Sequence, residues 1–209
     1  FPPERPGIVT DTPGPSDPAD RRKFMPEYEK RTRRDLSAAL RALLREEPLD
    51  QLRVRELTER CGLRRQSFYY HFNDIYDLFD WCLRQERALL LERLENCLTW
   101  RQALLELLDR AAGERAFYQA ALDREGQAGL GRMIPLEEVL EAVQVYYRDR
   151  CGTAPDRAAE ERERRCGQAL LLSLLEGWIR GGLALTPEEL ADALERTAEK
   201  SAAGAVWQT

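Results

Sequence analysis

The chain has 209 residues, enough for one large domain or two small ones, and 43% of them are hydrophobic while 33% are charged. This composition is typical of a globular protein with an apolar core, and no apolar run approaches the roughly 20 residues that span a bilayer. The five cysteines form no CxxC pair, so we expect reduced thiols in a cytoplasmic protein. With a single histidine and no cysteine cluster, a metal site is not expected.

The net charge of −5 is unevenly distributed along the chain. Residues 30–72 contain eleven Lys and Arg against six Asp and Glu, so this segment carries +5 and the remainder −10. A basic segment on an acidic body is typical of a nucleic-acid-binding unit joined to a second functional unit. The alternative interpretation is that the arginines decorate solvated helix faces, and charge alone does not separate the two.

Residues 1–20 contain six prolines and two glycines with little apolar periodicity, which predicts a disordered leader. Residues 21–31 are basic, and they could form an arm that reaches DNA phosphates or the minor groove. A frayed extension of the first helix is the alternative. We assign residues 1–30 to a leader and basic arm.

Three short helices are predicted next. The first is indicated by apolar residues spaced along one helix face, namely Leu36, Ala39, Leu40, Leu43 and Leu44. A second helix pattern runs from Val54 to Cys61 and a third from Arg64 to Phe72, with Gly62 in the turn between them. Two short helices joined by a tight glycine turn indicate a helix-turn-helix, whose second helix enters the DNA major groove.

The third helix carries the side chains expected to contact DNA. Phe68 and Phe72 are four residues apart and are expected to face inward, which leaves the opposite face for DNA. Arg65 could pair with guanine and Gln66 with adenine, each worth about 1–3 kcal/mol of discrimination. The expected DNA-contacting residues are Arg53, Arg55, Arg64, Arg65, Gln66, Ser67, Tyr69, Tyr70 and His71. For the two tyrosines, packing against the next helix is the alternative, and the histidine receives no catalytic role.

The sequence pattern predicts helices in the rest of the chain as well. Asp74 is expected to N-cap a long connector helix that continues to about Cys97. Further helices are predicted at residues 100–112, 115–123, 136–147, 156–180 and 187–200, with a glycine-rich loop at 126–131 and a capping box at 186–189. The predicted fold class is all-α: an N-terminal three-helix helix-turn-helix domain plus a C-terminal helical bundle, about nine helices in all.

The stretch from Leu36 to about Trp81 resembles the DNA-binding domain of TetR-type transcription regulators. The resemblance rests on the apolar first helix, on Val54 with Leu57 in the second, and on two strings, Cys61-Gly62-Leu63 and Ser67-Phe68-Tyr69-Tyr70-His71-Phe72. Asp77-Leu78 continues the match into the connector helix. Further along, Phe117-Tyr118 and the segment 174–190 are similar to a Firmicutes-type C-terminal subgroup, and the helix-turn-helix string is similar to regulators of dihydroxyacetone kinase operons.

Three positions depart from the pattern of this family. Arg64 stands where a small hydroxyl residue usually caps the third helix. Asn73 and Ile75 stand where the family often has lysines. Two expected phosphate contacts are therefore absent, and Arg64 and Arg65 are the candidates to compensate for them.

The resemblance implies a homodimer whose two recognition helices read a palindromic operator in double-stranded DNA. It assigns residues 31–73 to the DNA-binding domain and residues 74–203 to a ligand-binding and dimerisation domain. The implied dimer seam contains Leu171, Leu175, Trp178 and Leu190. The implied effector pocket is lined by Trp100, Phe117, Tyr118, Tyr146 and Tyr147. Intramolecular core is the alternative for both sets.

These features predict a sequence-specific DNA-binding transcriptional regulator, a ligand-responsive repressor that acts as a homodimer. The alternative is a coactivator or adaptor that keeps the fold but binds another regulator, which the missing lysines and the acidic body favour. An enzyme is not expected, because the chain has no G-x-S-x-G motif and no phosphate-binding glycine loop. No cofactor is implied.

Overall fold

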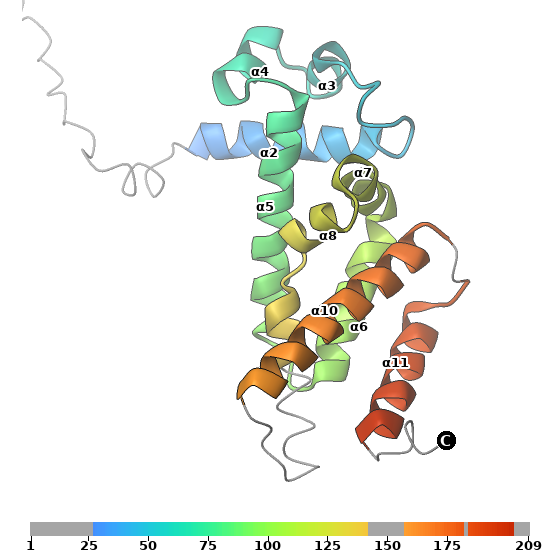
Figure 1. The fold of residues 1–209 in the computed structure, drawn as a ribbon. Coiled ribbons are helices and arrows are strands. Elements are labelled where there is room, and N and C mark those ends of the chain that lie inside the picture. The colour runs from blue at the N-terminus through green and yellow to red at the C-terminus, as the bar shows by residue number, and fades with distance from the viewer. Residues whose placement is uncertain (1–26, 142–156, 182–183, 203–209) are drawn as a thin grey trace, which may run out of the picture.

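The computed structural model describes residues 27–141, 157–181 and 184–202; within these ranges it contains nine α-helices whose two ends are both described, a further helical run at residues 136–141, and no strand (Figure 1). With the labels of Figure 1, the helices are α2 (Glu27–Leu43), α3 (Val54–Arg60), α4 (Arg65–His71), α5 (Ile75–Leu94), α6 (Trp100–Gly113), α7 (Arg115–Glu125), α8 (Gln127–Met133), α10 (Arg157–Ile179) and α11 (Pro187–Ala202). The predicted all-α class is confirmed. The helix predicted at residues 136–147 is present from 136 to 141, and its remainder lies outside the described residues, as does the leader up to residue 26.

The helices form an N-terminal unit of α2, α3 and α4 and a body made of the other described helices. α2 lies across one end of α5, and α3 and α4 sit beyond it at the top of Figure 1. α5 runs from this unit into the body, where it packs on α6 and α8. α10 packs on α7 and α8, and α11 packs on α6. α5 therefore connects the two parts.

The first helix is longer than the sequence pattern suggested. α2 begins at Glu27, so residues 27–30 are helical and do not belong to an unstructured arm. Thr32 is 3% exposed, and its hydroxyl donates to the Tyr28 carbonyl at 3.1 Å, which satisfies a buried polar group within this first part of the helix. The helix extension is thus the correct alternative for these four residues.

Two predicted caps are confirmed. The Asp74 carboxylate accepts a hydrogen bond from the Asp77 backbone N–H at 2.8 Å at the start of α5. Before α11, the Thr186 hydroxyl accepts from the Glu189 N–H at 3.2 Å, and the Glu189 carboxylate accepts from the Thr186 N–H at 2.8 Å. Both ends are satisfied locally, because each cap supplies a partner to a backbone group that the helix leaves unpaired.

The predicted glycine-rich loop at residues 126–131 is wrong, because most of this segment is helix α8. Gly126 has φ +59 and makes the sharp change of direction between α7 and α8. Gly129 lies against the α7 backbone, where an added Cβ would be 2.3 Å from the Ala121 carbonyl oxygen. The glycines therefore permit close contact between two helices, a use that local sequence does not distinguish from a loop.

Gly129→Ala is expected to destabilise the protein by about 1–3 kcal/mol, since backbone atoms must move to admit the methyl group. Gly131→Ala is the matched control on the same helix, because nothing lies within 4 Å of its added Cβ. The control should be neutral or stabilising by up to about 1 kcal/mol, as alanine favours helix. Urea unfolding measures both; equal losses at the two positions would contradict the close contact.

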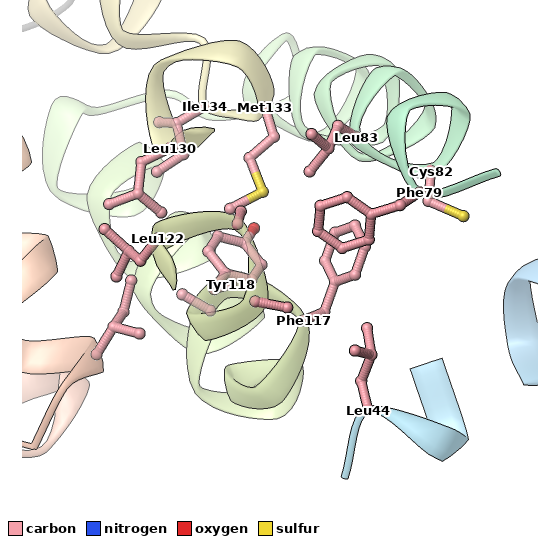
Figure 2. Packing of buried hydrophobic residues seen from close by; sticks show 14 of the residues in the cluster. Leu44, Phe79, Cys82, Leu83, Phe117, Tyr118, Leu122, Leu130, Met133 and Ile134 are labelled. Atoms are coloured by element: carbon pink, nitrogen blue, oxygen red, sulfur yellow. The ribbon is translucent and has the colours of Figure 1, made fainter. Parts of the chain in front are cut away.

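One apolar cluster extends through both parts of the molecule. Figure 2 shows Phe79 of α5 against Phe117 of α7, with ring centroids 5.2 Å apart. Leu44 approaches from the N-terminal unit and Met133 from α8. The N-terminal unit is therefore packed on the body and not merely tethered to it. No helix in the described ranges is long and apolar enough to cross a membrane.

Candidate nucleic-acid interface

The turn between α3 and α4 has the geometry expected of a helix-turn-helix. Gly62 has φ +65, a left-handed conformation that side chains disfavour. The Leu63 N–H donates to the Thr58 carbonyl at 2.8 Å, which closes the end of α3. Arg64 precedes α4 in an extended conformation and provides no side-chain cap, as its departure from the family pattern predicted. α4 thus starts at a defined angle, but its first N–H groups have no side-chain partner.

Two aromatic residues anchor α4 to the rest of the molecule. Phe68 is 0% and Phe72 is 4% exposed, which confirms that both face inward. The Phe72 ring packs on Phe68 at 6.0 Å and on Trp81 of α5 at 5.9 Å between centroids. Because residues 68 and 72 occupy one side of a two-turn helix, the opposite side faces solvent.

The outward side of α4 presents most of the residues expected to contact DNA. Arg64, Arg65 and Gln66 are exposed, and Ser67 is half-buried. Tyr69 is 58% exposed, and its ring meets the edge of Phe68 at 5.4 Å. Tyr69 therefore faces solvent, and the alternative, in which it fills a gap against α5, does not describe its position. Long donors and an aromatic ring on one solvent-facing helix side can reach base edges and phosphates.

Tyr70 and His71 are tied to α2. Tyr70 is 72% exposed, but its hydroxyl donates to the Glu29 carboxylate at 3.2 Å. Burial and then the positive charge of Arg33 lower the pKa of His71, while the charge of Glu29 opposes this. The imidazole is therefore neutral at pH 7. It can donate or accept one hydrogen bond, but it brings no positive charge to a phosphate.

The two arginines at the start of α3 differ in their availability. Arg53 is exposed, and its backbone N–H donates to the Glu56 carboxylate at 2.9 Å, which helps to cap α3. The Arg55 guanidinium donates to Glu59 on its own helix at 2.6 Å. Arg55 must therefore exchange this partner before it can hold a phosphate, whereas no such pair engages the side chain of Arg53 among the described contacts.

The residue-by-residue prediction missed a basic segment at the beginning of α2. Arg31 and Arg34 are exposed there, and Arg31 lies 3.9 Å from Asp35 in a weak surface pair. Arg33 is half-buried, with its guanidinium 5.6 Å from the centroid of the Phe72 ring. The charge count over residues 30–72 contained this signal, but it did not show that the residues lie on a helix next to α4.

The residues predicted to line an effector pocket are packed in the core. Trp100 is 5%, Phe117 1% and Tyr118 0% exposed, while Tyr146 and Tyr147 lie outside the described residues. Neither of two surface hollows in the described part of the chain contains these side chains. One, of about 750 Å³, lies between residues 44–51 and α7; the other, of about 700 Å³, lies where α5 meets α6. The amphipathic pattern could not separate core from pocket.

The residues predicted to form a dimer seam are also buried within a single chain. Leu171, Leu175, Trp178 and Leu190 are 7%, 1%, 5% and 3% exposed. The Trp178 indole N–H donates to the Leu185 carbonyl at 2.8 Å, which holds the segment before α11 against α10. Each of these side chains is therefore packed within its own chain, as the intramolecular alternative describes. Within the described residues, no group of three or more His, Cys, Asp or Glu could hold a metal ion.

Comparison with known proteins agrees with this architecture. Residues 36–81 match the model of the family described as bacterial regulatory proteins, tetR family. This segment contains α3, α4, the C-terminal half of α2 and the first turns of α5. Residues 36–81 are therefore similar to the helix-turn-helix unit of TetR-type transcription regulators, which confirms the resemblance seen in the sequence.

Two known regulators are similar to larger parts of the chain. Over 88 residues it is 26% identical to the dhaKLM operon transcriptional activator DhaS of Lactococcus lactis subsp. lactis (strain IL1403), which is 42% of this chain and 47% of that protein. The alignment thus spans about half the length of this curated relative. A solved structure of the dihydroxyacetone kinase operon activator DhaS has a TM-score of 0.66 at 21% identity, covering 82% of this chain and 96% of the other.

NalD of Pseudomonas aeruginosa, the secondary repressor of the MexAB-OprM multidrug efflux pump, gives a TM-score of 0.57 at 22% identity. The alignment covers 82% of this chain and 96% of NalD. At these identities the two structural likenesses establish the fold.

Proposed function

We propose that the protein is a sequence-specific DNA-binding transcriptional regulator that reads double-stranded DNA with α4. The observation that carries this proposal is the two-sided character of α4. Phe68 and Phe72 are buried, and Arg65, Gln66 and Tyr69 are exposed on the other side. The body would then supply dimerisation and a response to an effector, with residues 31–73 as the DNA-binding domain and 74–203 as the second domain.

We further propose a homodimer on a palindromic operator, with α10 at its two-fold axis. The side of α10 opposite its buried residues carries Cys166, Ala169 and Leu170, which are exposed at helical spacing. Leu170 is 56% exposed. An apolar and small-residue strip facing solvent is a suitable surface for an identical helix. Two recognition helices would then lie about 34–36 Å apart, one turn of DNA.

Leu170→Glu is expected to convert the dimer to monomer at micromolar concentration and to abolish operator binding, because two buried carboxylates would meet near the axis. Leu98→Glu is the matched control, since Leu98 is 90% exposed in the turn between α5 and α6. Sedimentation velocity gives the mass of each variant. A Leu170→Glu protein that remains dimeric would place the seam elsewhere.

An effector can act only by binding one arrangement of the dimer better than another. We propose that this selection occurs in the body, where Trp100, Phe117 and Tyr118 pack between α5 and its neighbours. The direction of regulation differs between the two relatives, since DhaS is named an activator and NalD a repressor. We propose a repressor, and we expect its operator to overlap the promoter.

The test is a titration of the full chain against duplex DNA selected by this protein from a randomised pool, at two salt concentrations. The expected result is one dimer per enriched palindrome and a steep salt dependence. A site with six to ten phosphate contacts loses about 10³–10⁵ in affinity between about 50 and 200 mM salt. If no sequence is enriched, the proposal fails.

A coactivator that binds another regulator is the second candidate, and one observation favours it. Asn73 donates from its backbone N–H and from its side chain to Asp77, at 3.0 and 3.1 Å, and Ile75 is 8% exposed. Neither Asn73 nor Ile75 can therefore make the phosphate contact that a lysine would make at its position. This candidate predicts that duplex DNA is bound only after a partner regulator is added, which a repeat of the selection and titration with that partner present would reveal.

A further inference from the structure

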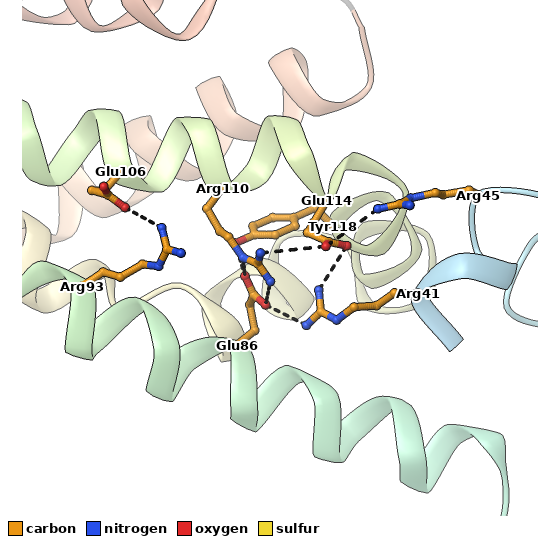
Figure 3. Close-up of polar contacts among 8 residues, drawn as sticks. All are labelled: Arg41, Arg45, Glu86, Arg93, Glu106, Arg110, Glu114 and Tyr118. Carbon is orange, nitrogen blue, oxygen red and sulfur yellow. Dashed lines mark hydrogen bonds and ion pairs between the residues drawn. The ribbon is translucent and has the colours of Figure 1, made fainter. Parts of the chain in front are cut away.

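A buried carboxylate in the middle of α5 is the centre of a charged cluster (Figure 3). Glu86 is 1% exposed. Arg110 of α6 donates to it from Nε at 2.6 Å and from Nη2 at 2.9 Å, and the Tyr118 hydroxyl of α7 donates at 3.1 Å. Burial by itself would raise the pKa of Glu86, but the hydrogen bonds and the nearby arginine charges outweigh it and lower the pKa. The carboxylate is therefore ionised and held by the body.

Arg41 brings α2 into this cluster. Its Nη2 donates to the Glu86 carboxylate at 2.7 Å, and its Nη1 lies 3.4 Å from a Glu114 oxygen. The guanidinium carbon is 3.9 Å from the centroid of the Phe117 ring. The Arg41 side chain is 14% exposed. The planar guanidinium of Arg41 thus contacts the body at three residues: two of its edges meet Glu86 and Glu114, and one face meets Phe117.

These contacts determine how the Arg41 guanidinium is oriented relative to the body, as well as how far it lies from it. A guanidinium is rigid and planar, so a carboxylate at one edge and an aromatic ring on its face together define its orientation. α2 packs on α3, and α3 packs on α4. The orientation of Arg41 relative to α5 and α7 is therefore passed to the recognition helix through packed helices.

We propose that Arg41 is a positioning residue that holds the N-terminal unit at one angle to the body through Glu86, and that operator affinity depends on this contact. The inference rests on the proposed function, because it concerns how well α4 is placed on DNA. A rearrangement of α5, α6 and α7 that moved Glu86 or Phe117 would change the angle of α4 through this side chain.

Arg45 offers a matched control for Arg41. It lies one helical turn further along the chain, is 59% exposed, and pairs with Glu114 at a distance of 3.9 Å. Arg41→Met and Arg45→Met each remove one positive charge from the same region. In the Arg41→Met protein, Glu86 keeps its hydrogen bonds from α6 and α7, so no buried carboxylate is left without a partner.

The first experiment measures affinity for the duplex that the wild-type protein enriches from a randomised pool. Arg41→Met should bind about 5–150-fold more weakly, the usual range of coupling between two sites, with an unchanged salt slope. Arg45→Met should bind like the wild type. Adding Glu86→Gln to Arg41→Met should cause little further loss, because each change breaks the same contact. Equal losses for the two arginine variants, or additive losses in the double variant, would overturn the inference.

The second experiment requires no DNA. Spin labels on non-canonical residues at Gln66 and Gln119, both exposed, report the distance between α4 and α7. Labelled chains are mixed with excess unlabelled protein, so that each pair reports on one chain. We expect a narrow distribution for the wild type and Arg45→Met and a broader or shifted one for Arg41→Met. An unchanged distribution for Arg41→Met would refute the inference; failure of the wild type to enrich any duplex would instead refute the proposed function.

Discussion

Replacing Arg65 and Tyr69 together with alanine is expected to weaken operator binding by about 30–1,000-fold, or roughly 2–4 kcal/mol. The arginine contributes about 1–3 kcal/mol if it holds a guanine edge, and a tyrosine hydroxyl on a phosphate adds about 1 kcal/mol. Both side chains are solvent-facing on α4, so the buried Phe68 and Phe72 stay in place, although Phe68 loses the edge contact of the Tyr69 ring. Binding should fall in a fluorescence anisotropy titration, while the mass of the dimer stays the same.

The control is Arg84→Ala, which removes an exposed arginine from α5 without touching α4. It should leave operator affinity within about twofold of the wild type, since one distant surface charge contributes little at physiological salt. The free energy of unfolding of each of these variants should differ from that of the wild type by no more than about 0.5 kcal/mol. If the double variant binds DNA as well as the Arg84 variant, α4 is not the reading helix.

The second large effect is expected at Glu86. Glu86→Ala should destabilise the protein by about 3–5 kcal/mol, because Arg41 and Arg110 would retain buried charges without their carboxylate. Glu106→Ala is the matched control, since Glu106 pairs with Arg93 at 2.9 Å but both side chains are more than 40% exposed (Figure 3). Such a surface pair contributes about 0–1 kcal/mol. Urea unfolding at fixed protein concentration measures both variants.

Acidification supplies a further check on Glu86. Because its pKa is lowered in the folded protein, its contribution to stability is complete above the pKa of an unfolded glutamate, about 4.3. That contribution is lost as the pH falls through the lower, folded value. The difference in unfolding free energy between wild type and Glu86→Ala should therefore shrink in acid. A difference that stays constant with pH would show that lost packing, and not lost charge, causes the effect.

The helix-turn-helix was predictable from sequence because its signals are local. Gly62 requires a left-handed turn, and the four-residue spacing of Phe68 and Phe72 defines the buried side of α4. The capping of α5 by Asp74 is equally local. Each of these features depends on residues within one or two turns of each other, so the amino-acid order alone indicates the geometry.

The features that the sequence did not reveal depend on distant partners. Leu171 and Trp178 have the pattern of an amphipathic helix, which is the same whether the apolar side meets its own chain or a second copy. Glu86 resembles a surface acid in the middle of a helix, because its partner Arg41 is 45 residues away. Gly129 resembles a loop residue until the Ala121 carbonyl is seen beside it.

The contact at Gly129 also constrains how the body can deform. Two helices separated by side chains can slide when those side chains change rotamer, but α7 and α8 meet at backbone distance at this point. Sliding there would drive the Gly129 backbone into the Ala121 carbonyl, so we expect α7 and α8 to move together as one rigid body. Phe117 and Tyr118 lie on α7 and Met133 lies on α8. We therefore expect a displacement of the aromatic residues of α7 to shift Met133 as well.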